Sequence, residues 1–215
     1  MLVEPQLYER LQCRWLRFWH DGNLRPPPGG DAHYRYLAWL YSDPRRGYHN
    51  LGHIEHCLVQ FDLNGGDATH PIEVELALWL HDAIYDAHAD DNEERSAELA
   101  VEVARCRGLD AAAQQRVHLH ILATKHDSKP VDADSQLVVD IDLSALALAE
   151  DQFRRDEQNF RYEYNWVPQA EYDENRRKSL LRFLERPTIY FTSRFRDLYE
   201  AAARQNLSQS LVRLG

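Results

Sequence analysis

The chain has 215 residues, of which 44% are hydrophobic and 28% charged, and its 35 acidic and 25 basic residues give a formal net charge of −10. This length and composition predict an ordinary soluble globular protein with a core of its own and exclude a disordered chain. The negative charge disfavours nucleic acid and anionic membrane surfaces as partners, whereas a small phosphorylated molecule can still be held by a metal ion and a few local cations.

The cysteines and the N-terminal segment indicate in which cellular compartment the protein is expected. Cys13, Cys57 and Cys106 are widely spaced, with no CxxC pair and no dense framework of the secreted kind. The segment MLVEPQLYER lacks a basic start followed by an apolar run, and no stretch approaches the roughly 18 apolar residues that a membrane helix needs. We therefore expect reduced thiols, a cytoplasmic protein and no membrane span.

Helical periodicity starts near the N-terminus and continues nearly throughout. It begins with Leu7, Leu11, Trp15 and Trp19, and no segment shows the sustained alternation of a strand. Glycine, proline, asparagine and aspartate predict loops at 22–31, 42–50, 64–71 and 126–134. Helix starts are predicted at Asp110, Asp134, Pro168 and Ser193.

The expected fold is all-α, a single bundle of roughly nine or ten helices. One domain over residues 1–215 is expected, with the site in a core of about 31–150 and the helices of 151–215 packed on it. The sequence leaves the oligomeric state open, a homodimer included.

The first candidate site segment is Tyr48-His49-Asn50-Leu51-Gly52-His53. His49 and His53 stand four residues apart at a loop-to-helix junction that Asn50 can cap, so both imidazoles can face one cavity. The apolar stripe that follows leaves His53 at the border of the core, which makes it the better ligand of the two.

The second segment, IEVELALWLHDAIY at 72–85, predicts a helix that is buried on most faces and carries His81 and Asp82 in its middle. A carboxylate in an apolar core costs several kcal/mol unless it is paired, hydrogen-bonded or bound to a metal. The sequence therefore predicts a partner for Asp82.

The third segment, SQLVVDIDLSALALA, is also apolar on almost all sides but contains Asp140 and Asp142. Two residues of separation put these carboxylates on different faces of a helix, so only one can meet His81 and Asp82. Taken singly, each polar residue is more simply a core hydrogen-bonding group or a cap. Together they predict a site of nitrogen and oxygen ligands for Mn, Co, Ni, Fe or Zn.

These residues resemble the signature of the HD superfamily of metal-dependent phosphohydrolases, which is a histidine, a later His-Asp doublet and a distant aspartate on an all-α scaffold. The resemblance implies His53, His81, Asp82 and Asp142 as metal ligands, with Asp140 as the alternative to Asp142. HDAIYD, DNEERSAE, ILATKH, DIDLSAL and RPTIYFTSRF are similar to a bacterial family of predicted HD phosphohydrolases. The chain lacks the HDxxH and HDxGK extensions of two-metal relatives, so one divalent transition metal per chain is expected.

The expected activity is hydrolysis of a phosphate ester or anhydride of a nucleotide or related small molecule. The segment around His49 also resembles cyclic-nucleotide phosphodiesterases, which implies His49 as the proton donor. Asp86, one helical turn after Asp82 in the predicted helix, is expected to be the base. Arg46, Lys125 and His126 are candidate substrate-binding residues, and His126 is also a candidate ligand of a second metal.

Two other functions stay open at this point. One is an oxygenase with an HD fold and a di-iron centre, and the other is a non-catalytic sensor or adaptor stabilised by its metal. Arg161, Tyr164, Arg176 and Arg177 in the C-terminal third read as exposed charge and partly buried rings, and they are left out of the expected site.

Overall fold

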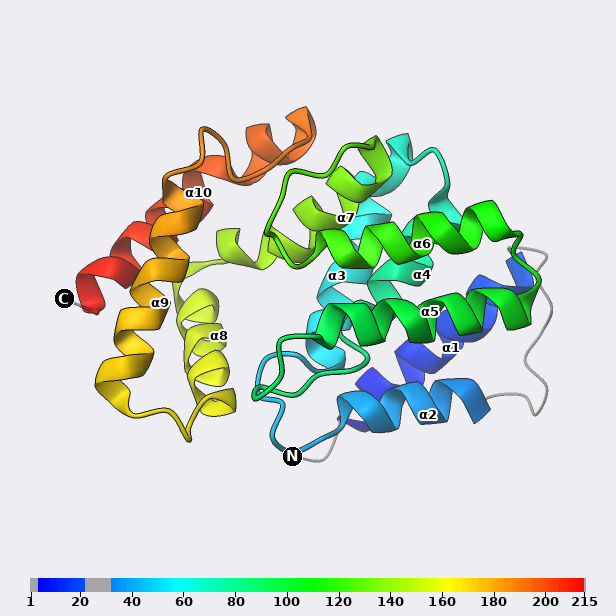
Figure 1. Ribbon diagram of the computed structural model, residues 1–215, viewed down its shortest axis with the longest axis horizontal. Coiled ribbons are helices and arrows are strands. Elements are labelled where there is room, and N and C mark those ends of the chain that lie inside the picture. Colours follow the sequence, from blue (N-terminus) through cyan, green and yellow to red (C-terminus); the bar gives the residue numbers. More distant parts are fainter. Residues whose placement is uncertain (1–3, 22–31, 215) are drawn as a thin grey trace.

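The computed structural model describes residues 4–21 and 32–214, which form ten α-helices and two 3-10 helices and no strand (Figure 1). The all-α prediction is confirmed, whereas the loop predicted at 22–31 lies outside the described residues. In chain order the elements are α1 (Pro5–Asp21), α2 (Ala32–Tyr41), α3 (Leu51–Asn64), η1 (Gly65–Asp67), α4 (Pro71–Leu80), α5 (Asn92–Arg107), α6 (Ala111–Ala123), α7 (Ala133–Asp142), η2 (Leu143–Ala147), α8 (Glu150–Glu163), α9 (Gln169–Leu184) and α10 (Ser193–Arg213).

Of the three asparagine and aspartate side chains predicted to cap helices, two do so and one does not. Asn50 caps α3 by accepting the N–H of Gly52, and Asp110 caps α6. At α7 the cap is Asp132 rather than Asp134. Asp134 lies inside the helix, and its carboxylate accepts the backbone N–H groups before α4. The prediction for Asp134 was wrong because either aspartate fits the local pattern of a cap.

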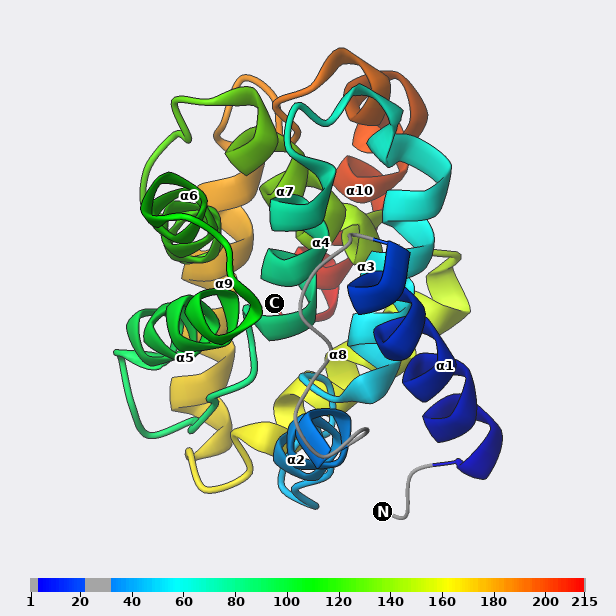
Figure 2. The same cartoon turned by 90° about the vertical axis from the view of Figure 1, so that its right-hand side faces the viewer.

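Helix α4 is the centre of the fold. It packs against α3, α5, α6 and α7, and Figure 2 shows α3, α4 and α7 in the middle, with α1 on one side and α5 and α6 on the other. From Val74 to Trp79 its residues are buried, apart from the half-buried Glu75, and Trp79 meets the Trp15 ring edge-on at 5.2 Å between centroids. This explains why the helix is apolar on nearly all sides.

The helix ends sooner than predicted, at Leu80. The N–H of His81 still donates to the carbonyl of Ala77, but Asp82 and the residues to 91 form turns and a loop. The apolar pattern of IEVELALWLHDAIY could not show this, because Ala83 and Ile84 continue the helical spacing after the helix has ended.

The helices α8, α9 and α10 lie at one end of the molecule and extend from η2 (Figure 1). Asp140 on α7 accepts the N–H groups of Phe191 and Thr192 just before α10, both at 2.7 Å. The amide of Asn206 donates to the carbonyls of Leu146 and Leu148. These bonds hold α10 against α7 and η2.

None of the helices in the described ranges 4–21 and 32–214 combines the length and the apolar character that crossing a bilayer requires.

Candidate metal centre

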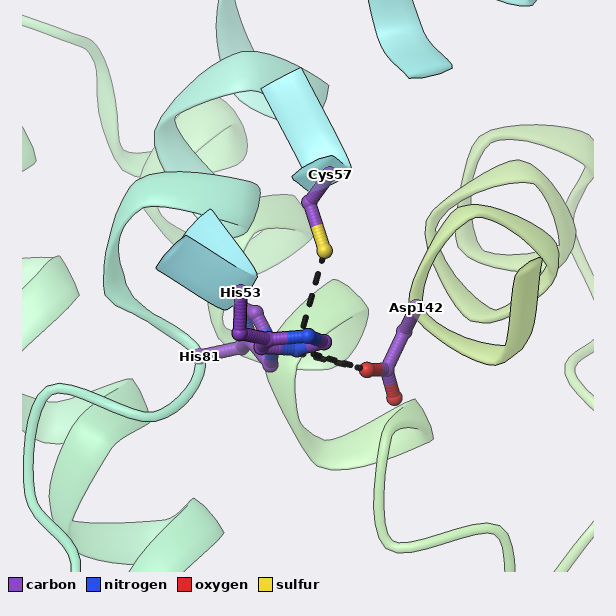
Figure 3. Close-up of side chains that lie close together, drawn as sticks. All are labelled: His53, Cys57, His81 and Asp142. Carbon is purple, nitrogen blue, oxygen red and sulfur yellow. Dashed lines mark hydrogen bonds and ion pairs between the residues drawn. The ribbon is translucent and has the colours of Figure 1, made fainter. Parts of the chain in front are cut away.

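Four side chains from three separate segments lie close together near the C-terminal end of α4. Ligand atoms of His53, Cys57, His81 and Asp142 all lie within 4.8 Å of one another (Figure 3). His53 and Cys57 stand one turn apart on α3, His81 follows α4, and Asp142 ends α7. Histidine, thiolate and carboxylate are the donor types that transition metals prefer, so this group could hold a metal ion.

The Asp82 carboxylate adjoins the same group. Its Oδ2 lies 3.1 Å from Nε2 of His81 and 3.6 Å from Nε2 of His53. Oδ1 of Asp142 lies 3.1 Å from Nε2 of His53 and 3.6 Å from Nε2 of His81, and the two imidazole nitrogens are 3.2 Å apart.

These distances fit a shared cation. Ligand bonds of about 2.1 Å place neighbouring donor atoms about 3.0 Å apart at right angles and about 3.4 Å apart in a tetrahedron. Five of the six pairs among His53, His81, Asp82 and Asp142 have separations of 3.1 to 3.6 Å. The spacing therefore accommodates one ion between them.

A hydrogen bond fixes the orientation of His81. Its Nδ1 lies 3.1 Å from the carbonyl oxygen of Leu78 and, in the neutral imidazole, donates to it. The Nε2 lone pair then faces the other ligand atoms. Such a bond from the second ring nitrogen is typical of metal-ligating histidines.

Charge at the centre favours a cation. Burial lowers the pKa of His81, but the charge of Asp82 and the bonds to both aspartates raise it well above its usual range. Burial raises the pKa of Asp142, but hydrogen bonds from His126, His53 and His81 bring it well below the usual value. The lowered pKa of Asp142 means that its carboxylate is ionised at neutral pH, and the raised pKa of His81 means that this place favours positive charge.

Cys57 was not predicted as a ligand from the sequence, where it was expected only to be a reduced thiol. Its sulfur lies 3.6 Å from Nε2 of His53, and the residue is fully buried. Burial raises the pKa of the thiol, and Asp142 and Asp82 raise it further. The i, i+4 spacing of His53 and Cys57 was the signal in the sequence, because it places both side chains on one helix face.

The choice between Asp140 and Asp142 can be made from their contacts. Asp142 joins the cluster, whereas Asp140 is fully buried and accepts bonds from Phe191 and Thr192. The prediction that the two carboxylates face different ways is confirmed by these contacts.

The centre forms part of the wall of a cavity of about 420 Å³. Asp82 and Asp142 of the candidate centre line it, together with His49, Lys125 and His126. Another part of the wall comes from the C-terminal segment, through aromatic, acidic and basic side chains: Phe153, Asp156, Glu157, Phe160, Tyr164, Arg176, Arg182 and Phe183.

His49 is held by a carboxylate that sequence reasoning did not find. Its Nδ1 lies 2.6 Å from Oε2 of Glu163, and its ring stacks on Tyr85 with 4.1 Å between centroids. Burial lowers the pKa of His49, but Glu163 and, after it, Asp82 raise it above the ordinary value overall. Nothing in the local pattern of α8 distinguishes Glu163 from its acidic neighbours.

Of the two basic residues predicted to bind substrate, Arg46 is bound instead to backbone carbonyls of the protein. Its guanidinium donates to the carbonyls of Asp82 at 2.7 Å and Ala83 at 2.9 Å. It therefore holds the turn that carries the His-Asp doublet and does not line the cavity. Lys125 lines the cavity but is paired with Glu94 at 2.5 Å and with the carbonyl of Asp90 at 3.1 Å.

The structure does not bring Asp86 to the centre. Because α4 ends at Leu80, Asp86 is not one helical turn after Asp82. It is exposed, its carboxylate accepts the N–H of His88, and it faces a separate hollow. Asn92 and Ser96 instead pin this loop through the backbone of Asp86 and Ile84.

The four C-terminal residues that were not expected in the site, Arg161, Tyr164, Arg176 and Arg177, divide into two kinds. Tyr164 and Arg176 line the cavity. Arg161 and Arg177 donate to backbone carbonyls of Val167 and Leu214 and stabilise helix ends. The helical pattern of these segments gave no indication of which arginine faces the site.

Comparison of the chain with family models, with curated proteins and with solved structures finds no match. The fold and the cluster therefore define the class on their own: a helical protein with a candidate metal centre that is compatible with an HD-type site.

Proposed function

We propose that the chain is a metal-dependent phosphohydrolase of the HD type that acts on a small phosphorylated molecule. The observation that carries the proposal is the spacing of His53, His81, Asp82 and Asp142 around one point in the wall of a cavity. The order of these residues along the chain is that of the HD signature, which supports the same conclusion.

In this proposal two imidazoles and two carboxylates hold one divalent transition metal. A metal ion held in this way supplies Lewis acidity toward a phosphoryl oxygen and lowers the pKa of a coordinated water. Cys57 adds a sulfur atom next to the ring of His53. Softer metals such as zinc, iron and cobalt accept a sulfur donor more readily than magnesium does.

His49 is suited to donate a proton to the leaving oxygen. It lines the cavity, and Glu163 fixes its ring and favours its protonated form. A general acid must be protonated and held at the site of bond cleavage, and this pair supplies both conditions.

Carboxylates other than Asp86 are available to orient a water molecule. Glu93 and Asp156 both line the cavity, and burial raises the pKa of each. A raised pKa brings a carboxylate closer to the range in which a general base works at neutral pH. We assign the role to one of these two.

The remaining wall suits a phosphorylated molecule with a planar part. Phe160 and Tyr164 stack at 5.1 Å between centroids, and the guanidinium of Arg176 lies 4.8 Å from the Phe160 ring. Flat rings bind bases, and guanidinium groups bind phosphates. A nucleotide combines both features.

The test is a panel of nucleotides and generic phosphoesters with added Mn²⁺ or Co²⁺. Turnover is expected for the wild type and for D86A, whose side chain is exposed and outside the cavity, and should be lost in D82A. Equal turnover in wild type and D82A would reject catalysis at this centre.

The same preparation distinguishes the two other functions. Two irons per chain with an oxygen-dependent spectrum would favour the di-iron oxygenase. One tightly bound metal without turnover of any phosphoester would favour the sensor or adaptor.

A further inference from the structure

His126 has an unusual backbone conformation. Its φ of 59° lies in the left-handed region, and among residues 4–21 and 32–214 no other residue except Gly108 has a positive φ. It follows the end of α6, where its N–H donates to the carbonyl of Ala123. A residue with a Cβ atom pays a cost in this region, and glycine or asparagine usually takes such positions.

The side chain of His126 contacts the carboxylate of Asp142 on the side away from the cluster. Nε2 of His126 lies 3.0 Å from Oδ2, whereas Oδ1 faces Nε2 of His53 at 3.1 Å and Nε2 of His81 at 3.6 Å. The two oxygens of one carboxylate thus have different partners. Metal-ligating carboxylates commonly have their second oxygen fixed by a donor of this kind.

The surrounding residues hold His126 in place. Arg186 donates to its carbonyl oxygen at 2.7 Å, and the Phe183 ring packs against the imidazole at 5.8 Å between centroids. Nδ1 is buried without a hydrogen-bond partner, so Nε2 makes the one polar contact of the ring with another described residue. Strained residues that persist in this way are typical of functional sites.

We propose that His126 is a positioning residue, which donates Nε2–H to Oδ2 of Asp142 and thereby aims Oδ1 at the metal. In this proposal His126 neither contacts the substrate nor binds a second metal, which were the two roles considered for it from the sequence. The proposal rests on metal binding in the proposed function and is independent of whether a phosphate is hydrolysed.

The test compares two variants of similar length and equal backbone cost. H126Q keeps an N–H donor at about the reach of Nε2, and H126M removes the donor. Mn²⁺ affinity is measured by calorimetry on full-length protein treated with a chelator and dialysed. H126M is expected to bind roughly 10- to 100-fold more weakly than the wild type, and H126Q is expected to stay closer to the wild type than to H126M.

Equal affinity of H126Q and H126M, or wild-type affinity in H126M, would overturn the positioning role. A wild type that binds no Mn²⁺, Co²⁺ or Zn²⁺ would overturn the metal centre itself, while binding without hydrolysis would reject only the proposed function.

A second pair isolates the backbone cost from the contact. H126G and H126A both lack the imidazole, but only glycine adopts the left-handed conformation freely. Without metal, H126G is expected to unfold at a higher temperature than H126A, while both bind Mn²⁺ equally weakly. The same unfolding temperature in both would contradict the view that this histidine is kept at a cost in stability.

Discussion

Nδ1 of His49 and Oε2 of Glu163 lie 2.6 Å apart although 114 positions separate the two residues in the chain. The carboxylate also accepts the N–H groups of Tyr48 and His49 and the hydroxyl of Tyr85. Helix α8 therefore completes the site that the N-terminal segments begin, and it holds the imidazole of His49 in one orientation.

The first prediction concerns the pH dependence of hydrolysis. Burial lowers the pKa of His49, but Glu163 and Asp82 raise it overall, so the protonated form persists above the usual pH range and is lost as pH rises through the raised pKa. In E163Q this support is lost. The alkaline limb of the pH profile of kcat/KM should move to lower pH, with a loss of activity of about 10²-fold or more at neutral pH.

The matched control is E157Q, on the same helix and also lining the cavity. Glu157 pairs with Arg213 and Arg176 and accepts the hydroxyl of Ser210, and it makes no bond to His49. Its substitution should leave the position of the alkaline limb unchanged, and an equal shift in both variants would show a general field effect instead of a specific pair.

Some polar residues of the candidate centre can be singled out from the sequence because they stand in apolar segments, whereas Cys57 cannot, since a thiol fits an apolar helix face. Asp82 and Asp142 stand in segments that are otherwise apolar, and that conflict is visible without coordinates. The helices followed from periodicity for the same reason, since burial of one face is a local property of the sequence.

Two features could not be predicted from the sequence: contacts between residues far apart in the chain, and the residue at which a helix ends. Glu163 lies in a polar stretch, where one more acid carries no signal. Helix α4 ends at Leu80, and Asn92 and Ser96 hold the loop that follows through hydrogen bonds to its backbone. Asp86 lies in this loop and therefore not at the candidate centre.

The second prediction separates the two aspartates of α7. In D140A the N–H groups of Phe191 and Thr192 lose their acceptor, so we expect a loss of about 2 to 4 kcal/mol in the free energy of unfolding, with metal binding retained. In D142A the candidate metal site lacks one of its proposed ligands. Added Mn²⁺ should then raise the thermal midpoint of the wild type and of D140A but not of D142A.

Metal-induced stabilisation can be measured by thermal unfolding of chelator-treated protein with and without added ion. Stabilisation of D142A equal to that of the wild type would remove Asp142 from the ligand set.

The third prediction concerns the thiols. Cys13 and Cys106 are exposed, whereas Cys57 is fully buried and its thiol has a pKa raised by burial. Since the thiolate is the reactive form, Cys57 should resist a thiol reagent in the native protein. Two of the three cysteines should react under native conditions and the third only after unfolding. The C57A variant tests the assignment, because it should show the same reaction of two thiols under native conditions and no further reaction after unfolding.

The last prediction uses His120 on α6, which is not one of the residues of the candidate metal centre. The residue is buried, and its Nδ1 lies 2.8 Å from Oγ of Ser135. Burial lowers its pKa below the ordinary 6.5, against smaller opposing effects of Asp132, Asp134 and Glu73, while His70 lowers it slightly further. The unfolded chain therefore binds a proton more readily than the folded one, and stability falls as pH drops below the ordinary value.

Replacing His120 by glutamine removes the group that takes up this proton. At about pH 7.5 the H120Q variant should be less stable by about 1 kcal/mol, because the bond to Ser135 is perturbed. Between about pH 7.5 and about pH 5.5 it should lose less stability than the wild type does, since one buried histidine no longer titrates. Urea unfolding of chelator-treated protein at both pH values measures the two slopes, with H88Q, which removes an exposed histidine, as the control. If H120Q and wild type lost the same stability over this range, the buried imidazole would not contribute to acid sensitivity, and the carboxylates and histidines of the metal centre would have to account for it.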